Sequence, residues 1–262
     1  MNLDSSRAWL DWRLAVPFVG VGAAVGALVA LRLSLAVPAA DAAFPARGLV
    51  VFTARYLPTG GSVVSTQPGA LRGLELPFLF ATGAVMAGQL VAAALGTAVA
   101  CWRVSADEWL PPLSVVGWLV AYALGVALLL FTGLVVVGSG TVPPVVVSIP
   151  LLAPGVVLFL TPAVIVIEGT SAWAGIARGA SLFAAAPVRL TATALLVGYV
   201  GYLCTGVTAL VGSGSVATYA VGAVAGTAVG GPIHAVALLW LYERLGEAGT
   251  ATAGHTGPSP SE

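Results

Sequence analysis

Residues 113–137 decide the fold class of this chain, and they read LSVVGWLVAYALGVALLLFTGLVVV. The run contains no charged residue. A helix needs about 20 apolar residues to cross the roughly 30 Å of hydrocarbon in a lipid bilayer. This stretch therefore predicts a transmembrane helix.

The composition of the whole chain agrees with a membrane protein. Of the 262 residues, 59% are hydrophobic and only 8% are charged, whereas about 25% of the residues in a soluble protein are charged. The mean hydropathy is +1.02. The formal net charge is zero, so electrostatics offers no argument for nucleic acid as a partner. The composition excludes an ordinary soluble domain and indicates the lipid bilayer as the main partner.

Further stretches are long and apolar enough to cross a bilayer, so the sequence predicts an all-α polytopic membrane protein with six transmembrane helices. The expected spans are 14–37, 76–101, 113–137, 145–167, 190–211 and 216–242. The fourth span contains Pro150, Pro154 and Pro162. We expect it to be a kinked helix whose neighbours satisfy the freed carbonyl groups. All six spans belong to a single membrane domain, residues 1–245.

The arginines favour an orientation with both termini in the cytoplasm. The chain has no lysine, and arginine is enriched on the cytoplasmic side of membrane proteins. A six-span topology places more arginines on the side of the termini than on the other. Those on the side of the termini are Arg7, Arg13, Arg103, Arg178, Arg189 and Arg244. The sequence therefore predicts a multi-pass protein of the cell membrane.

The segments outside the spans differ in character. The outer loop, 38–75, is long, and its piece 49–57 fits either a short strand or an interfacial helix. On the inner side, residues 5–14 carry tryptophan, which prefers the headgroup layer, and are expected to form an interfacial helix. The tail, 246–262, is rich in small and polar residues and is expected to be disordered.

A second inner amphipathic helix is predicted over residues 171–183. At 100° per residue, Arg178 points away from the apolar face, and Leu182 falls on the polar side. The apolar face consists of Trp173, Ile176, Ala180 and Phe183. Such a helix is expected to lie on the membrane surface without crossing it.

His234 is a candidate functional residue in the sixth span, because an ionisable group in hydrocarbon is costly. It continues the row of Gly222, Gly226 and Gly230, each four residues apart. Glycine at this spacing lets another helix approach closely, so we expect His234 to face protein. A neutral imidazole bonded to a neighbouring helix is the simpler interpretation. A proton relay or a substrate contact is the alternative.

The earlier spans carry two further signals of helix packing. Gly22 and Gly26 of the first span have the same four-residue spacing and mark a second site of close approach. Gln89 of the second span is interpreted as an interhelical hydrogen bond, with a ligand contact as the alternative.

The sequence predicts no enzyme, no cofactor and no metal site. Ser139 and Ser213 each lie in Gly-Ser-Gly, but both are expected at the outer surface. Ser213 would be roughly 30 Å from His234 along the helix, beyond the reach that a general base needs. Motifs for phosphate or zinc are absent from the sequence. The acidic pair 107–108, beside Arg103 and Trp109, is interpreted as a solvated charge cluster.

The stretches PAVIVIEG (162–169) and GIARGASL (175–182) resemble a recurring pattern, and LPF at 76–78 and LYERL at 241–245 agree with it. The pattern is that of an uncharacterised, archaeal-type family of six-helix integral membrane proteins related to the membrane domain of glycerophosphoryl diester phosphodiesterase. In that family a proline-bearing span ends in Glu-Gly and leads into an amphipathic helix that carries arginine. The matching residues are Pro162, Glu168, Gly169 and Arg178.

The resemblance implies a fold and a membrane location but no activity, because the catalytic domain of those enzymes is a separate unit without a counterpart here. One difference lies in the surface helix. The alanine and serine that are usual in the family are Gly175 and Gly179 in this chain. Each glycine weakens an exposed helix by roughly 1 kcal/mol.

These observations favour a non-enzymatic integral membrane protein with a structural, accessory or lipid-organising role. The alternative is a small-solute permease with a cavity near the fourth and sixth spans. A closely packed midplane would favour the first function, and a polar cavity that touches Gln89 or His234 would favour the second. The sequence leaves open whether the chain forms a homo-oligomer or binds another membrane protein.

Overall fold

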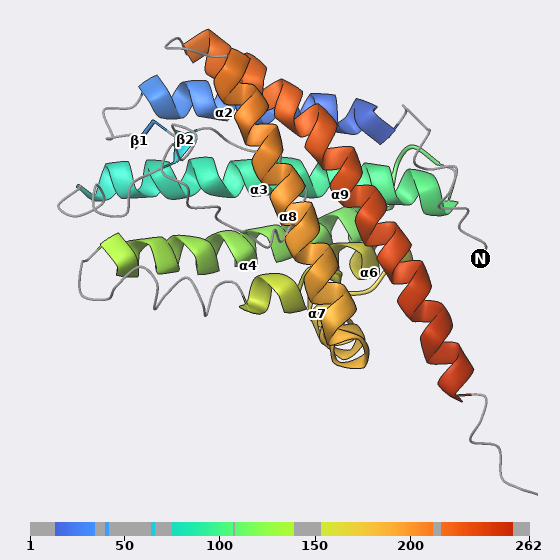
Figure 1. Cartoon of the computed structure of the whole chain (residues 1–262). Helices are drawn as coiled ribbons and strands as arrows, with labels where there is room; N and C mark the ends of the chain where they lie inside the picture. The colour runs from blue at the N-terminus through green and yellow to red at the C-terminus, as the bar shows by residue number, and fades with distance from the viewer. Residues whose placement is uncertain are drawn as a thin grey trace, which may run out of the picture.

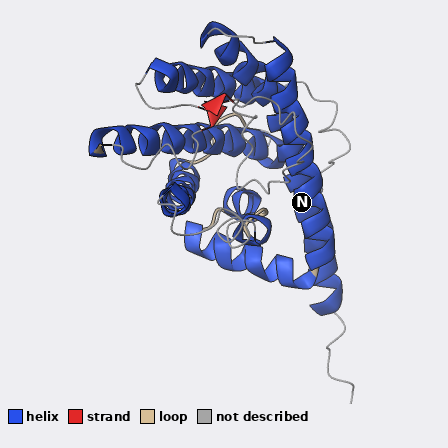
Figure 2. Cartoon of the chain, turned by 60° about the vertical axis from the view of Figure 1, so that its left-hand side comes forward, coloured by secondary structure: helices blue, strands red, loops and turns tan. Residues whose placement is uncertain are grey.

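In the computed structural model the chain folds into long helices (Figure 1), and Figure 2 shows that helices make up nearly all of the described chain. The structure describes residues 14–34, 40–41, 64–65, 75–106, 108–138, 153–211 and 216–253. The helices are α2 (Ala15–Ser34), α3 (Leu76–Ala106), α4 (Leu113–Gly138), α6 (Thr161–Glu168), α7 (Ala172–Ala185), α8 (Pro187–Val211) and α9 (Val216–Ala253). Two short strands, β1 (Ala40–Asp41) and β2 (Val64–Ser65), pair antiparallel.

Among the described residues, four helices are long and apolar enough to cross a membrane. They are α2, α3, α4 from Leu113 to Gly133, and α9 from Val216 to Leu245. The number rises to five if α7 and the first part of α8 are counted together as one bent span. The prediction of an all-α fold with several helices long and apolar enough to cross a membrane is therefore confirmed, whereas the count of six spans is not confirmed.

The predicted fourth span, 145–167, is broken in the structure. A short helix at 153–157 is followed by a turn at 158–160 and then by α6. Its described part, the apolar segment Ala153–Glu168, is shorter than a full crossing, and residues 145–152 of the predicted span lie outside the described residues. Pro162 occupies the first turn of α6, where a missing N–H is tolerated, so it begins a new helix. Over the described residues, the kink that the prolines predict is therefore a break at 158–160 between two short helical segments.

α7 and α8 meet at a sharp bend of 110°. The linking residue, Ala186, donates its N–H to the carbonyls of Leu182 and Phe183 and ends α7. Pro187, the first residue of α8, has no N–H and cannot extend the preceding helix. The predicted surface helix, 171–183, is therefore a helix separate from α8.

The long helices form a layer with a pair of helices laid across it. α2, α3 and α4 lie side by side, α9 packs on α2, and α8 packs on α9 (Figure 1). Gly88 of α3 faces Leu28, and Gly96 faces Val21, so α2 and α3 run antiparallel. Short α6 contacts α3, α4, α7 and α9 and so lies near the centre of the arrangement.

Phe18 is the residue around which three helices meet. Its side chain is fully buried. Its ring lies against Gly96 of α3 and Gly231 of α9, and a Cβ on either glycine would meet atoms of this ring. The two glycines therefore make room for one aromatic ring of α2, and this contact belongs to the larger cluster of buried side chains, which joins α2, α3, α4 and α9.

α9 continues beyond the predicted end of the sixth span at residue 242 and reaches Ala253. The expectation of a disordered tail, 246–262, is therefore corrected for the residues up to Ala253. Extending a formed helix adds a hydrogen bond for each residue, and alanine is the best helix former. Residues 254–262, the predicted helix 5–14 up to residue 13, and the segment 49–57 lie outside the described residues.

Candidate functional site

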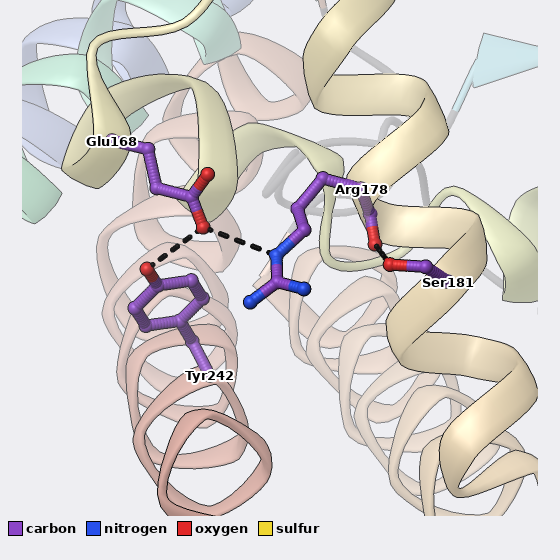
Figure 3. Close-up of polar contacts among 4 residues, drawn as sticks. All are labelled: Glu168, Arg178, Ser181 and Tyr242. Carbon is purple, nitrogen blue, oxygen red and sulfur yellow. Dashed lines mark hydrogen bonds and ion pairs between the residues drawn. The ribbon is translucent and has the colours of Figure 1, made fainter. Parts of the chain in front are cut away.

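A polar cluster joins three helices at the end of α6 (Figure 3). The Tyr242 hydroxyl of α9 donates to Glu168 Oε1 at 3.0 Å, and Arg178 Nε of α7 donates to the same oxygen at 3.5 Å. The Ser181 hydroxyl donates to the Arg178 carbonyl at 2.7 Å. The Glu168 side chain is 27% exposed and that of Arg178 is 50% exposed. The cluster lies at the protein surface and connects α6, α7 and α9.

Local sequence positions the Glu168 carboxylate. Gly169 adopts φ of 64° and ends α6 immediately after Glu168, in the left-handed region that glycine favours. Ser171 then caps α7 by accepting the N–H of Ala174. The chain thereby reverses within a few residues, so that Arg178 of α7 lies beside the end of α6.

The arrangement connects the three helices through one carboxylate. One carboxylate oxygen accepts from a phenol and a guanidinium, and an exposed ion pair contributes about 0–1 kcal/mol. Across the described ranges, no three His, Cys, Asp or Glu side chains gather to hold a metal ion.

α7 packs against α6 through glycine. A Cβ on Gly175 would lie 2.5 Å from Ile165 Cγ1, and one on Gly179 would lie 2.8 Å from Thr161 Oγ1. Leu182, on the face predicted to be polar, is buried with them. The close contact leaves no room for a Cβ at either glycine unless the neighbouring side chains move.

The predicted apolar face of α7 is not the one that packs on the protein. Trp173 belongs to that predicted face and is 79% exposed. α7 instead buries its glycines and Leu182 against α6, because small residues allow a close approach between helices. The placement of Leu182 on the polar side is corrected accordingly.

His234 is buried inside the protein. Its exposed fraction is 2%, and its ring stacks on Phe159 with a distance of 5.1 Å between ring centroids. Gly222, Gly226 and Gly230 are buried as well. A Cβ on Gly230 would meet Cys204 Sγ of α8 at 3.5 Å, an ordinary contact.

A closer approach between helices is made by the glycines of α2. A Cβ on Gly22 would lie 2.7 Å from Val224 Cα, and one on Gly26 would lie 2.9 Å from the Ala220 carbonyl oxygen. Both obstacles are backbone atoms of α9. The later glycine of α2 meets the earlier residue of α9, so the two helices run antiparallel with their backbones in contact.

The other sequence candidates do not join a common site. Gln89 is partly buried on α3. The expected interhelical hydrogen bond of its side chain is absent among the hydrogen bonds of the described residues. Ser139 and Ser213 lie outside those residues.

An apolar groove lies between α2 and α3. Its volume is about 370 Å³, and Gly20 and Ala24 of α2 face Leu95 and Val99 of α3 across it. Trp109, in the connection after α3, also lines the groove. The Arg103 guanidinium lies 4.8 Å from the centroid of the Trp109 ring system, in a cation–π contact. Sequence reasoning missed this groove because it requires the packing of two helices.

Comparison with known proteins assigns no family to this site. No protein family, curated protein or solved structure matches the chain. The resemblance to six-helix membrane proteins related to the membrane domain of glycerophosphoryl diester phosphodiesterase therefore stays a prediction, and the function is argued from geometry.

Proposed function

We propose that this chain is a non-enzymatic, multi-pass protein of the cell membrane with a structural, accessory or lipid-organising role. The observation that carries the proposal is the packing around His234. The imidazole is 2% exposed, and Phe159, Leu238 and Thr227 are fully buried. A transporter needs a polar route to a binding site near the bilayer midplane. His234, the ionisable residue of the predicted sixth span and the residue best suited to such a route, is instead enclosed by other side chains.

The permease alternative has less support. It requires a polar cavity that touches Gln89 or His234. The groove between α2 and α3 is lined by apolar side chains and Trp109, and neither Gln89 nor His234 is among them. An apolar, open groove suits lipid better than a hydrated solute.

We propose six membrane crossings with both termini in the cytoplasm. The antiparallel contact of α2 with α9 supports this topology, because the start of α2 and the later part of α9 then point to the same side. A crossing between α4 and α7 is needed to complete the count. In this proposal the predicted fourth span, 145–167, supplies it. The 110° bend and the exposed Trp173 support a location of α7 on the inner membrane surface.

We also propose membership in the six-helix family that the sequence resembles. The support is the polar cluster, since Glu168 of the quoted motif contacts both Arg178 of the motif and Tyr242 of the quoted 241–245 stretch. A motif that forms one connected set of side chains has a structural reason to recur.

Flux measurements test the proposed function. The full chain, reconstituted into liposomes, is expected to carry no solute or proton flux above protein-free liposomes. Cells that lack the protein are expected to differ from wild type in membrane lipid content. A saturable flux that His234→Phe abolishes would overturn the proposal in favour of a transporter. An unchanged lipid content together with that flux would point the same way.

A further inference from the structure

We propose that the hydroxyl of Tyr122 in α4 holds the break at 158–160 in place and thereby keeps Phe159 stacked on His234. The inference goes beyond the proposed function, because it concerns how one conformation of the chain is maintained and not what the protein does in the membrane. It is argued from contacts that join α4, the break and α9. Its test measures local opening and involves no flux.

The carbonyl of Leu158 lacks its ordinary helical donor. In an α-helix each carbonyl accepts the N–H of the residue four positions later. For Leu158 that residue is Pro162, which carries no N–H. The Thr161 N–H donates to the carbonyl at 3.1 Å, one residue earlier than in an α-helix, and the Tyr122 hydroxyl donates to the same oxygen at 3.3 Å. The tyrosine thus supplies from α4 a donor that the proline cannot supply.

The hydrogen bond from Tyr122 lies in a place where a lost donor is costly. Tyr122 is 3% exposed, and the side chains of Phe159 and Leu160 in the break are fully buried, so water has little access to the contact. A peptide oxygen has two lone pairs and can accept the hydroxyl and the Thr161 N–H together. Removing the hydroxyl leaves part of that capacity unused away from water, which destabilises the break.

The effect of this bond reaches Phe159 through a rigid unit. The carbonyl of Leu158 and the N–H of Phe159 belong to one planar peptide group, which ends at the Cα of Phe159. The Phe159 N–H donates to the Val156 carbonyl at 3.3 Å. The peptide group is therefore held at its oxygen and at its N–H. Holding it fixes the direction in which the Phe159 side chain leaves the backbone.

The ring of Phe159 covers His234 of α9. The two rings stack with an interplanar angle of 22° and 5.1 Å between their centroids, and aromatic rings prefer stacked or edge-to-face pairs at such separations. The exposed fraction is 0% for Phe159 and 2% for His234. Rotating the peptide group after Leu158 would withdraw the ring and expose the imidazole. Tyr122 is therefore a positioning residue for the enclosure of His234.

Chemical modification of His234 tests the inference. The full chain, purified in detergent micelles, is treated with diethyl pyrocarbonate, which modifies accessible imidazoles, and the rate is measured by mass spectrometry of the peptide that contains His234. Tyr122→Phe is expected to raise the rate about twofold to tenfold, the factor that one hydrogen bond contributes to an opening equilibrium. Tyr242→Phe is the matched control, because it removes a tyrosine hydrogen bond to Glu168, away from the break, and is expected to leave the rate unchanged.

Two further measurements identify the cause of the effect. Pro162→Ala restores a backbone N–H four residues after Leu158, where an α-helix uses it. In this background Tyr122→Phe is expected to change the rate by less than about twofold. Hydrogen exchange separates local from general opening: in Tyr122→Phe the N–H of Thr161 is expected to exchange faster, and the N–H of Gly175 in α7, also hydrogen-bonded, is expected to be unchanged.

Three results would overturn the inference. Equal modification rates in Tyr122→Phe and Tyr242→Phe would show that the hydroxyl does not keep Phe159 in place. An equally large increase with and without Pro162→Ala would show that the hydroxyl does not replace the N–H that proline lacks. Faster exchange at Gly175 as well as at Thr161 would show that the whole protein had loosened and that the effect does not belong to the break.

Discussion

Replacing Gly22 with alanine tests the contact between α2 and α9. The added Cβ would lie 2.7 Å from Val224 Cα and 3.0 Å from its carbonyl oxygen. Carbon atoms in contact prefer separations of about 3.5–4.0 Å. The atoms in the way are backbone, so no rotation of a side chain relieves the overlap. The two helices must separate locally by about 1 Å.

Such overpacking costs typically 1–3 kcal/mol, and we expect the free energy of unfolding to fall by about that amount. Gly20→Ala is the matched control. Gly20 lies two positions earlier on the same helix, and a Cβ there would meet nothing within 4 Å. The control gains helix propensity, by at most about 1 kcal/mol in a water-exposed helix, and is expected to be as stable as wild type or more stable.

The assay is unfolding of the purified chain by sodium dodecyl sulfate in mixed micelles, followed by tryptophan fluorescence. The two variants are compared by their unfolding midpoints and slopes. A Gly22→Ala protein that unfolds with the same midpoint as Gly20→Ala would refute the reasoning, because it would mean that α2 and α9 are not in backbone contact at this position.

Three further substitutions are expected to separate structural from functional roles. Gly179→Ala places a Cβ 2.8 Å from Thr161 Oγ1; it should loosen α7 by about 1 kcal/mol and speed limited proteolysis there, and unchanged cleavage would argue against the contact. Tyr242→Phe removes the hydrogen bond to Glu168 and should cost about 0.5–1.5 kcal/mol in the detergent titration; a double-mutant cycle with Glu168→Ala that is fully additive would contradict the pairing. His234→Phe keeps an aromatic ring in a buried site and should change stability by less than about 1.5 kcal/mol; a larger loss would show that an imidazole hydrogen bond is required.

The fold class could be predicted because the bilayer imposes it segment by segment. Backbone groups in hydrocarbon must be satisfied within the segment, so a long apolar run such as 113–137 has few alternatives to a helix. The same reasoning located α2, α3 and α9. It did not determine the form of the break in the fourth span, because Pro162 can kink a helix or begin a new one, and the choice depends on which groups surround it.

The candidate site was predictable only in part. Glu168 and Arg178 were indicated by a resemblance, and they contact each other across a short reversal of the chain. The third partner, Tyr242, is separated from Glu168 by 74 positions, and no local pattern connects them. The groove beside Gly20 was not expected at all, because it exists only where two helices leave a gap.

The sequence by itself determined that this chain is helical, apolar and built to cross a membrane, because hydropathy acts on each segment independently of the others. Only the tertiary structure decided which faces meet. Gly22 of α2, rather than Gly230 of α9, marks the tighter helix contact, and Leu182 is buried although periodicity placed it among polar residues. The physical reason is that helices in a bilayer associate through shape, and shape complementarity depends on pairs of surfaces that are distant in the chain.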